Sequence, residues 1–170
     1  MIKAIFWLTM ITFIPALELR GSIPVGIFSM GDRLSWTVVF LICVTANIIL
    51  GWIVFAILGP VFYIIRKWRW FEDKIWPILE RTRHRIHPYI EKYGELGIAI
   101  FIGIPLPGSG VYTGAFGAYL IGMDKKKFAI ANVLGVLIAA VAVTTLSLLI
   151  LHGAVGDNSL LARLFLKNVH

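Results

Sequence analysis

Cysteine and charge are what this chain has least of. Cys43 is the one cysteine and lies inside an apolar run, so the sequence excludes an intrachain disulfide and a cysteine-based metal cluster. Charged residues make up 15% of the 170 residues and hydrophobic residues 59%, whereas soluble domains average about 25% and 45–50%. The composition therefore indicates a single integral membrane domain, residues 1–170.

Acidic residues are also scarce, at nine Asp and Glu against sixteen Lys and Arg. No carboxylate pair lies in an apolar setting, no nucleophile is accompanied by a base, and no acidic cluster suits Mg²⁺, so we expect no enzyme and no cofactor. The net charge of +7 is concentrated between the apolar stretches. That placement favours membrane topology and contact with anionic lipids, and it argues against binding of nucleic acid.

Two stretches carry no Asp, Glu, Lys or Arg over a length that can cross a bilayer. Residues 34–65 form the first and residues 128–152 the second. A helix needs about 20 apolar residues to span the hydrocarbon core. We therefore predict two transmembrane helices, followed by a polar tail at residues 153–170.

Residues 96–121 are equally apolar but are broken in the middle by proline and glycine, from Pro105 to Gly110. Proline removes a backbone donor, and clustered glycine weakens any regular structure. Broken backbone at membrane depth survives only where protein or a water-filled cavity satisfies its polar groups. This pattern predicts a re-entrant hairpin that returns to the side from which it entered.

Residues 1–33 have a similar character, with a second Pro/Gly-broken piece from Glu18 to Gly26. Residues 4–14 are too few to span a bilayer, and no cleavage site of a signal peptide follows them. We predict a first re-entrant hairpin here, with the alternative that residues 4–14 lie in the membrane interface.

The two halves resemble each other. Gly21-Ser22 precedes Ala46-Asn47, and Gly108-Ser109 precedes Ala131-Asn132 at about the same separation. Two such halves with one crossing between them would form an inverted repeat, which many transporters build around a midplane site. Since two spans and two hairpins enclose little of a path, we expect a homodimer or larger homo-oligomer.

The connector at residues 66–95 holds eight Lys and Arg against five acids, and Lys125–Lys127 would lie on the same side. The positive-inside rule makes that side cytoplasmic in a multi-pass protein of the cell membrane. The connector has an apolar stripe at helical spacing, which predicts two or three short interfacial helices interrupted at Pro77 and Pro88; a solvated loop is the alternative. Its basic flank would bind lipid phosphate through Lys67, Lys74, Arg81, Arg85 and Lys92.

Glu18 and Arg20 are the charges at membrane depth. Such charges are costly there and usually belong to a functional cavity. Arg20 could receive an anionic headgroup, while Glu18 could take up a proton from outside. Alternatively, the two residues form an ion pair or cap a neighbouring broken helix without touching substrate.

The remaining candidates surround these two charges. Backbone N–H groups near the second tip could hold a phosphate with Arg20, or the tip glycines could simply allow close packing. The proposed substrate-contacting set also includes Gly21, Ser22, Pro105, Pro107, Gly108, Ser109, Gly110, Tyr112 and Thr113. Asn47 and Asn132 lie in the spanning helices and are expected to support the tips by hydrogen bonds. His84 and His87 have a metal-compatible spacing, but we expect no metal site.

The motifs Glu18–Pro24 and Ile104–Gly114 resemble those of the small multi-drug export protein family, and the resemblance runs nearly end to end. That family is in turn similar to the DedA/VTT superfamily, whose members share two membrane-entering hairpins and include lipid scramblases and carriers of polyprenyl phosphate. The resemblance implies that the acidic and arginine positions of the first hairpin are Glu18 and Arg20. The second hairpin departs from the DedA pattern because it lacks arginine.

These observations predict an all-α membrane transporter or flippase of the DedA/VTT type that moves a lipid phosphate, either a polyprenyl phosphate or a phospholipid. The interfacial basic connector and the arginine in an apolar setting both suit a phosphate headgroup with an apolar tail. Export of lipophilic cations is the second hypothesis. A membrane assembly protein that transports nothing is the third.

Overall fold

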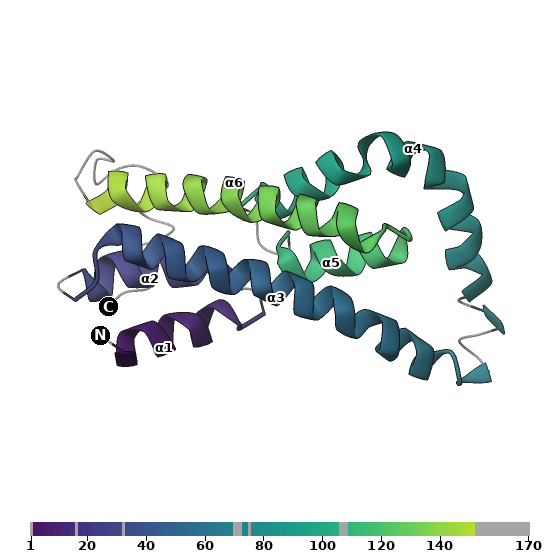
Figure 1. Cartoon of the computed structure of the whole chain (residues 1–170), viewed down its shortest axis with the longest axis horizontal. Helices are drawn as coiled ribbons and strands as arrows, with labels where there is room; N and C mark the ends of the chain where they lie inside the picture. Colours follow the sequence, from purple (N-terminus) through teal and green to yellow (C-terminus); the bar gives the residue numbers. More distant parts are fainter. Residues whose placement is uncertain are drawn as a thin grey trace.

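The computed structural model describes residues 2–15, 17–31, 33–69, 73–74, 76–105 and 109–151, apart from the side chains of residues 79 and 82–93. The regular structure in these residues is helical throughout (Figure 1), which confirms the predicted all-α class. In chain order the labelled helices are α1 (Ile2–Thr12), α2 (Glu18–Met30), α3 (Trp36–Ile65), α4 (Trp76–Gly103), α5 (Val111–Leu120) and α6 (Lys125–Leu151).

The two long uncharged runs form the two long apolar helices. α3 has 30 residues and α6 has 27, and both are long and apolar enough to cross a membrane. At 1.5 Å per residue they are about 45 and 40 Å long, which exceeds the hydrocarbon thickness of about 30 Å. α3 continues through Pro60 to Ile65. The prediction of two helices of spanning length is confirmed.

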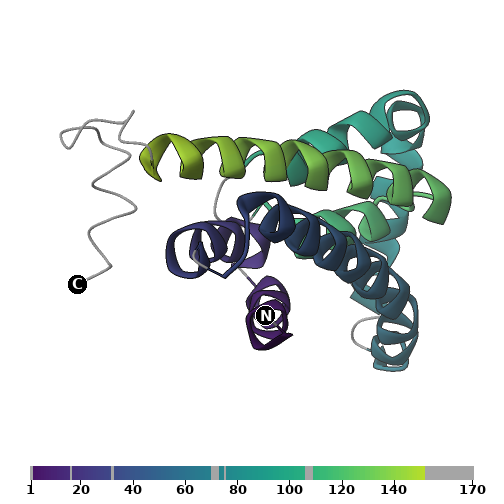
Figure 2. The same cartoon turned by 60° about the vertical axis from the view of Figure 1, so that its left-hand side comes forward.

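The short helices α1, α2 and α5 each accompany about half of α3, and α5 pairs with the end of the longer helix α4. α1 and α2 pack on each other and on α3, while α5 packs on α3 and on the end of α4. The end of α1, the end of α4 and the start of α5 all lie near the middle of α3 (Figure 1). Figure 2 shows α6 along one side of α3 and α1 along the other. The broken stretches of both pairs therefore meet inside the molecule.

The break in the first pair is not where the sequence predicted it. α2 is continuous from Glu18 to Met30 with Pro24 inside it, and the chain instead turns between Thr12 and Glu18. Packing of α2 against three other helices outweighs the local cost of the proline. Gly26 allows α2 to pack closely on α3, because a Cβ at this position would overlap the side chain of Val39. Residues 2–12 form a packed helix of the pair.

The second half of the connector is one helix. The predicted interruptions at Pro77 and Pro88 are wrong, since α4 runs from Trp76 to Gly103 without ending. Pro77 lies in the first helical turn, where a missing N–H costs little. Pro88 lies in the interior of α4, and the helix is strongly curved in Figure 1, as expected where a backbone hydrogen bond is lost.

The two long helices cross closely where Asn132 of α6 meets α3. The amide nitrogen Nδ2 of Asn132 donates to the carbonyl of Ile48 over 3.0 Å. A Cβ on Gly51 would lie 2.5 Å from both polar atoms of this amide, so only glycine allows the approach. The described hydrogen bond of Asn132 thus goes to α3. Contact of the two asparagines with the hairpin tips stays a prediction, since part of the second tip lies outside the described residues. Asn47 is also buried, and its Oδ1 has no partner among the described residues.

Candidate functional site

Glu18 connects the start of α2 to the start of α5. Its carboxylate accepts the backbone N–H groups of Val111 over 3.0 Å and of Tyr112 over 3.3 Å. The first N–H groups of a helix have no partner within the helix and carry the positive end of its dipole. Glu18, only 3% exposed, therefore caps α5 from a position 93 residues away.

The backbone at Glu18 and at Gly110 adopts a conformation that permits this contact. Glu18 has a φ of 45°, in the left-handed region that side-chain-bearing residues seldom adopt. A Cβ on Gly110 would overlap the carboxylate of Glu18, so the glycine is required for the approach. The strain at Glu18 persists because the carboxylate is fixed by α5.

Arg20 donates hydrogen bonds to backbone carbonyls at the end of α4. Its Nη2 donates to the carbonyls of Ile102 over 3.2 Å and Ile104 over 2.9 Å, and it also contacts the carbonyl of Ser109. The last carbonyls of a helix lack partners and carry the negative end of the dipole. The guanidinium thus closes the broken turn between α4 and α5.

The two side chains also pair with each other. Nη1 of Arg20 lies 3.8 Å from Oε2 of Glu18, with the side chains 14% and 4% exposed. One turn of α2 therefore places a negative charge at the start of α5 and a positive charge at the end of α4. This geometry matches the ion-pair and capping alternative for Glu18 and Arg20.

One donor of Arg20 is not used by these contacts. Its Nε is buried and has no hydrogen-bond partner in the part of the chain that the structure describes. A buried donor without an acceptor costs about 1–3 kcal/mol. An oxygen of a bound headgroup or a water molecule would satisfy it.

Tyr112 makes the reverse connection, from α5 to α1. Its hydroxyl donates to the carbonyl of Phe13 over 2.6 Å, just beyond the end of α1. Each helix pair is therefore held by hydrogen bonds from a side chain of the other pair to its backbone. At the connection between α4 and α5, Ser109 Oγ donates to the Ile104 carbonyl over 2.7 Å, and Thr113 Oγ1 accepts the Gly110 N–H over 3.0 Å.

Other predicted substrate contacts lie elsewhere or outside the described residues. Ser22 is fully buried, and its hydroxyl oxygen lies 2.7 Å from that of Thr12, which holds α2 on α1. Gly21 faces the side chain of Leu17, and Pro105 is exposed. Pro107 and Gly108 lie outside the described residues.

Of the five connector residues predicted to bind lipid phosphate, the three whose side chains are described are exposed, namely Lys67, Lys74 and Arg81. Lys67 Nζ lies 5.3 Å from the ring centroid of Tyr63, which is near the end of α3. The side chains of Arg85, Lys92, His84 and His87 are not described. Within the described ranges, no group of three or more His, Cys, Asp or Glu could hold a metal ion.

The sequence missed the partners of the two charges, because they are backbone groups. The carbonyls of Ile102 and Ile104 and the N–H groups of Val111 and Tyr112 carry no side-chain signature. Their one signal is position, since each lies next to a helix end where the backbone lacks a partner.

Two helices long and apolar enough to cross a membrane, with a Glu–Arg pair between the two helix pairs, indicate an α-helical membrane protein. The family model named “Putative small multi-drug export protein” matches residues 18–142, which is most of the chain. The chain belongs to this family, and the match begins at Glu18 and includes Arg20, the end of α4 and the start of α5. Neither the curated proteins nor the solved structures include a significant match.

Proposed function

We propose that this protein is a transporter that moves an amphipathic lipid phosphate across the bilayer and performs no covalent chemistry. The observation that carries the proposal is the position of Glu18 and Arg20, which hold opposite charges where both broken helix pairs meet, near the middle of α3 (Figure 1). Charges at such a depth are costly and are retained for function.

In the proposed topology each pair is a re-entrant hairpin, and the two halves are inverted copies. α1 has 11 residues and is about 16 Å long, half the hydrocarbon thickness of about 30 Å. Inverted halves around a midplane site would let the protein open alternately to the two faces. A homodimer or larger assembly would complete the walls of the path.

The orientation follows from the basic residues. Arg66, Lys67 and Arg69 follow α3, and Lys125–Lys127 begin the antiparallel α6, so both groups lie at the same end. We assign this end to the cytoplasm of a cell-membrane protein, where its cations would contact anionic lipid.

The headgroup would bind at Arg20. The side chain of Arg20 is partly exposed, and charge-assisted contacts of arginine with phosphate are strong. In this scheme the phosphate competes with Glu18 for the guanidinium, so that headgroup binding loosens the tie between the two pairs.

Export of lipophilic cations is the second candidate, favoured by the name of the family. That mechanism needs a carboxylate facing a cavity. Glu18 is instead 3% exposed, accepts two N–H groups and lies beside Arg20, which favours an anionic substrate.

The test is headgroup translocation in liposomes that hold the purified protein, comparing a polyprenyl phosphate with a lipophilic cationic dye. We expect the wild type to move the lipid and Arg20→Met to lose this activity. Tyr112→Phe is the matched control, because it breaks a contact between the pairs without changing charge and should keep lipid selectivity.

Dye movement driven by a pH gradient, with lipid unmoved, would contradict the proposal and support export. Movement of neither substrate by well-folded protein would favour a membrane assembly role. Size-exclusion chromatography of each variant before reconstitution separates loss of function from loss of fold.

A further inference from the structure

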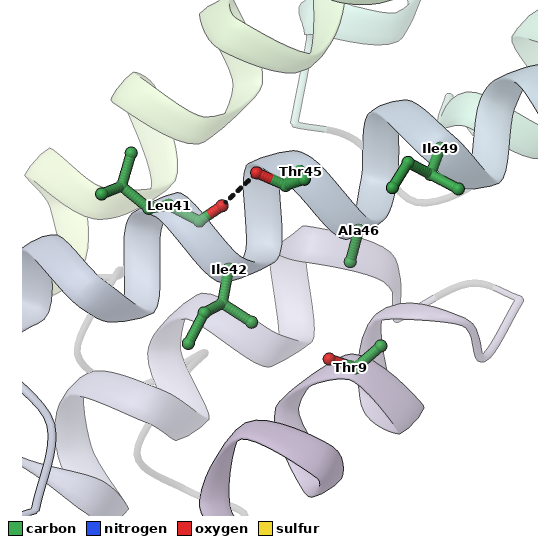
Figure 3. Close-up of a pocket in the computed structure, with 6 residues that line it drawn as sticks. All are labelled: Thr9, Leu41, Ile42, Thr45, Ala46 and Ile49. Carbon is green, nitrogen blue, oxygen red and sulfur yellow. Dashed lines mark hydrogen bonds between the residues drawn. The ribbon is translucent and has the colours of Figure 1, made fainter. Parts of the chain in front are cut away.

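A groove of about 410 Å³ lies between α1 and α3. Figure 3 shows its six lining residues, with Thr9 of α1 facing Ala46 across it. The lining residues are Thr9, Leu41, Ile42, Thr45, Ala46 and Ile49. Its volume falls within the range of about 300–1,000 Å³ that is usual for ligand sites.

The chemistry of the lining suits an apolar occupant. Leu41, Ile42, Ala46 and Ile49 carry no polar side-chain atom. The hydroxyls of the two threonines are already used, since Thr9 donates to the Ile5 carbonyl over 3.0 Å and Thr45 to the Leu41 carbonyl over 2.7 Å. The two threonine hydroxyls therefore have no free donor, and no lining side chain carries a charge, so the lining suits an apolar occupant better than a charged drug.

The groove is accessible from the side. Its rim includes Leu41 at 57% exposure and Ile49 at 43%, while Ala46 at its floor is 7% exposed. Both rim residues belong to the apolar outer surface of a helix that can cross a membrane. A hydrocarbon chain can therefore enter from the bilayer without crossing a polar layer.

The groove also ends beside the meeting point of the helix pairs. Thr9 lies one helical turn, about 6 Å, before Phe13 along α1. The carbonyl of Phe13 accepts the hydroxyl of Tyr112, whose backbone N–H binds Glu18. One amphipathic molecule can thus reach both the apolar groove and the charged pair.

We infer that this groove holds the hydrocarbon chain of the transported lipid while its phosphate headgroup lies at Arg20. The inference rests on the proposed function and adds a location for the tail. It explains why an apolar groove lies next to the charged meeting point. The proposed occupant of the groove is a lipid chain and not a second copy of the protein.

The experiment uses an isoprenoid phosphate that carries a diazirine in its tail, in phosphatidylcholine vesicles with the full chain. After irradiation, mass spectrometry locates the labelled peptides. We expect labelling at Thr9 and within residues 41–49, competed by unlabelled isoprenoid phosphate but not by the matching alcohol. Ala46→Phe fills the groove and should reduce this labelling about tenfold, because several methylene contacts are lost.

Two further variants make the result specific. Thr45→Leu adds bulk at an exposed lining position and should also reduce labelling, even if Ala46→Phe misfolds. Ile57→Phe places the same aromatic side chain on α3 outside the groove, where Ile57 is 53% exposed, and should change nothing.

Equal competition by the matching alcohol would overturn the inference. So would full translocation by a groove-filled variant that no longer labels. Translocation is measured on the same vesicles: if the wild type moves lipid but never labels the groove, the inference fails and the proposed function stands. If the wild type moves no lipid, the proposed function itself fails.

Discussion

At the scale of residues, Glu18 and Arg20 serve two helix ends at once. Glu18 accepts N–H groups at the start of α5, and Arg20 donates to carbonyls at the end of α4. Each charge thereby meets the helix-dipole end of opposite sign. Because backbone groups at helix ends lack partners within the helix, the pair stabilises the break between α4 and α5.

Substitution of Glu18 should destabilise the protein in proportion to what is removed. Glu18→Gln keeps an acceptor for Val111 but loses the charge, and we expect a loss of about 1–2 kcal/mol in the free energy of unfolding. Glu18→Ala also leaves Arg20 without its partner and should cost about 3 kcal/mol. Unfolding in detergent, followed by circular dichroism, measures both, and equal stability of the two variants would contradict this capping role.

Loss of the Tyr112 hydroxyl should cost about 1 kcal/mol, because the carbonyl of Phe13 then lacks its donor. Tyr112→Phe measured against Tyr63→Phe isolates the effect, since Tyr63 is 69% exposed. The same unfolding assay applies. A Tyr112→Phe protein as stable as the Tyr63→Phe control would mean that the hydroxyl does not hold the two pairs together.

The sequence pointed to Glu18 and Arg20 but not to their partners. A charge in an apolar stretch stands out in any sequence, so both residues were predictable as candidates. The carbonyls of Ile102 and Ile104 belong to ordinary apolar residues whose side chains play no part. Contacts of side chains with distant backbone follow from tertiary packing, which residue patterns do not encode.

At the scale of elements, α3 and α6 were predictable and the breaks were not. A long run without charge has one stable form in a membrane, a helix, so its limits follow from composition. Pro24 and Pro88 each remain inside a helix, whereas the chain turns around Pro15. Proline lowers the stability of a helix interior, but packing of the whole helix decides where the helix ends.

The crossing of α3 and α6 gives a matched pair of glycine substitutions on one helix. Gly51→Ala places a methyl group against the amide of Asn132 and should cost about 1–3 kcal/mol through overpacking. A Cβ added to Gly59 would meet no atom within 4 Å, so Gly59→Ala should be neutral or stabilising by up to about 1 kcal/mol. Thermal unfolding of both in detergent provides the comparison, and equal effects would rule out a close contact at Gly51.

At the scale of the whole molecule, the proposed architecture has two half-length pairs that enter from opposite faces and meet at Glu18 and Arg20. The basic ends of α3 and α6 lie together, while Lys3 and Arg33 lie at the opposite end of α3 (Figure 1). This asymmetry of charge fixes the proposed orientation. The lengths of α1 and α5, 11 and 10 residues, require that neither crosses the bilayer alone.

The side of the membrane from which single cysteines can be labelled tests this architecture most directly. In a Cys43→Ala background, cysteines replace Lys3, Arg33, Glu95 or Asp124 in turn, and a membrane-impermeant maleimide is applied to intact cells. We predict labelling at Lys3 and Arg33, and protection of Glu95 and Asp124 until the membrane is opened. Labelling of Lys3 and Arg33 from opposite faces would mean that the first pair crosses the membrane, and it would contradict the account.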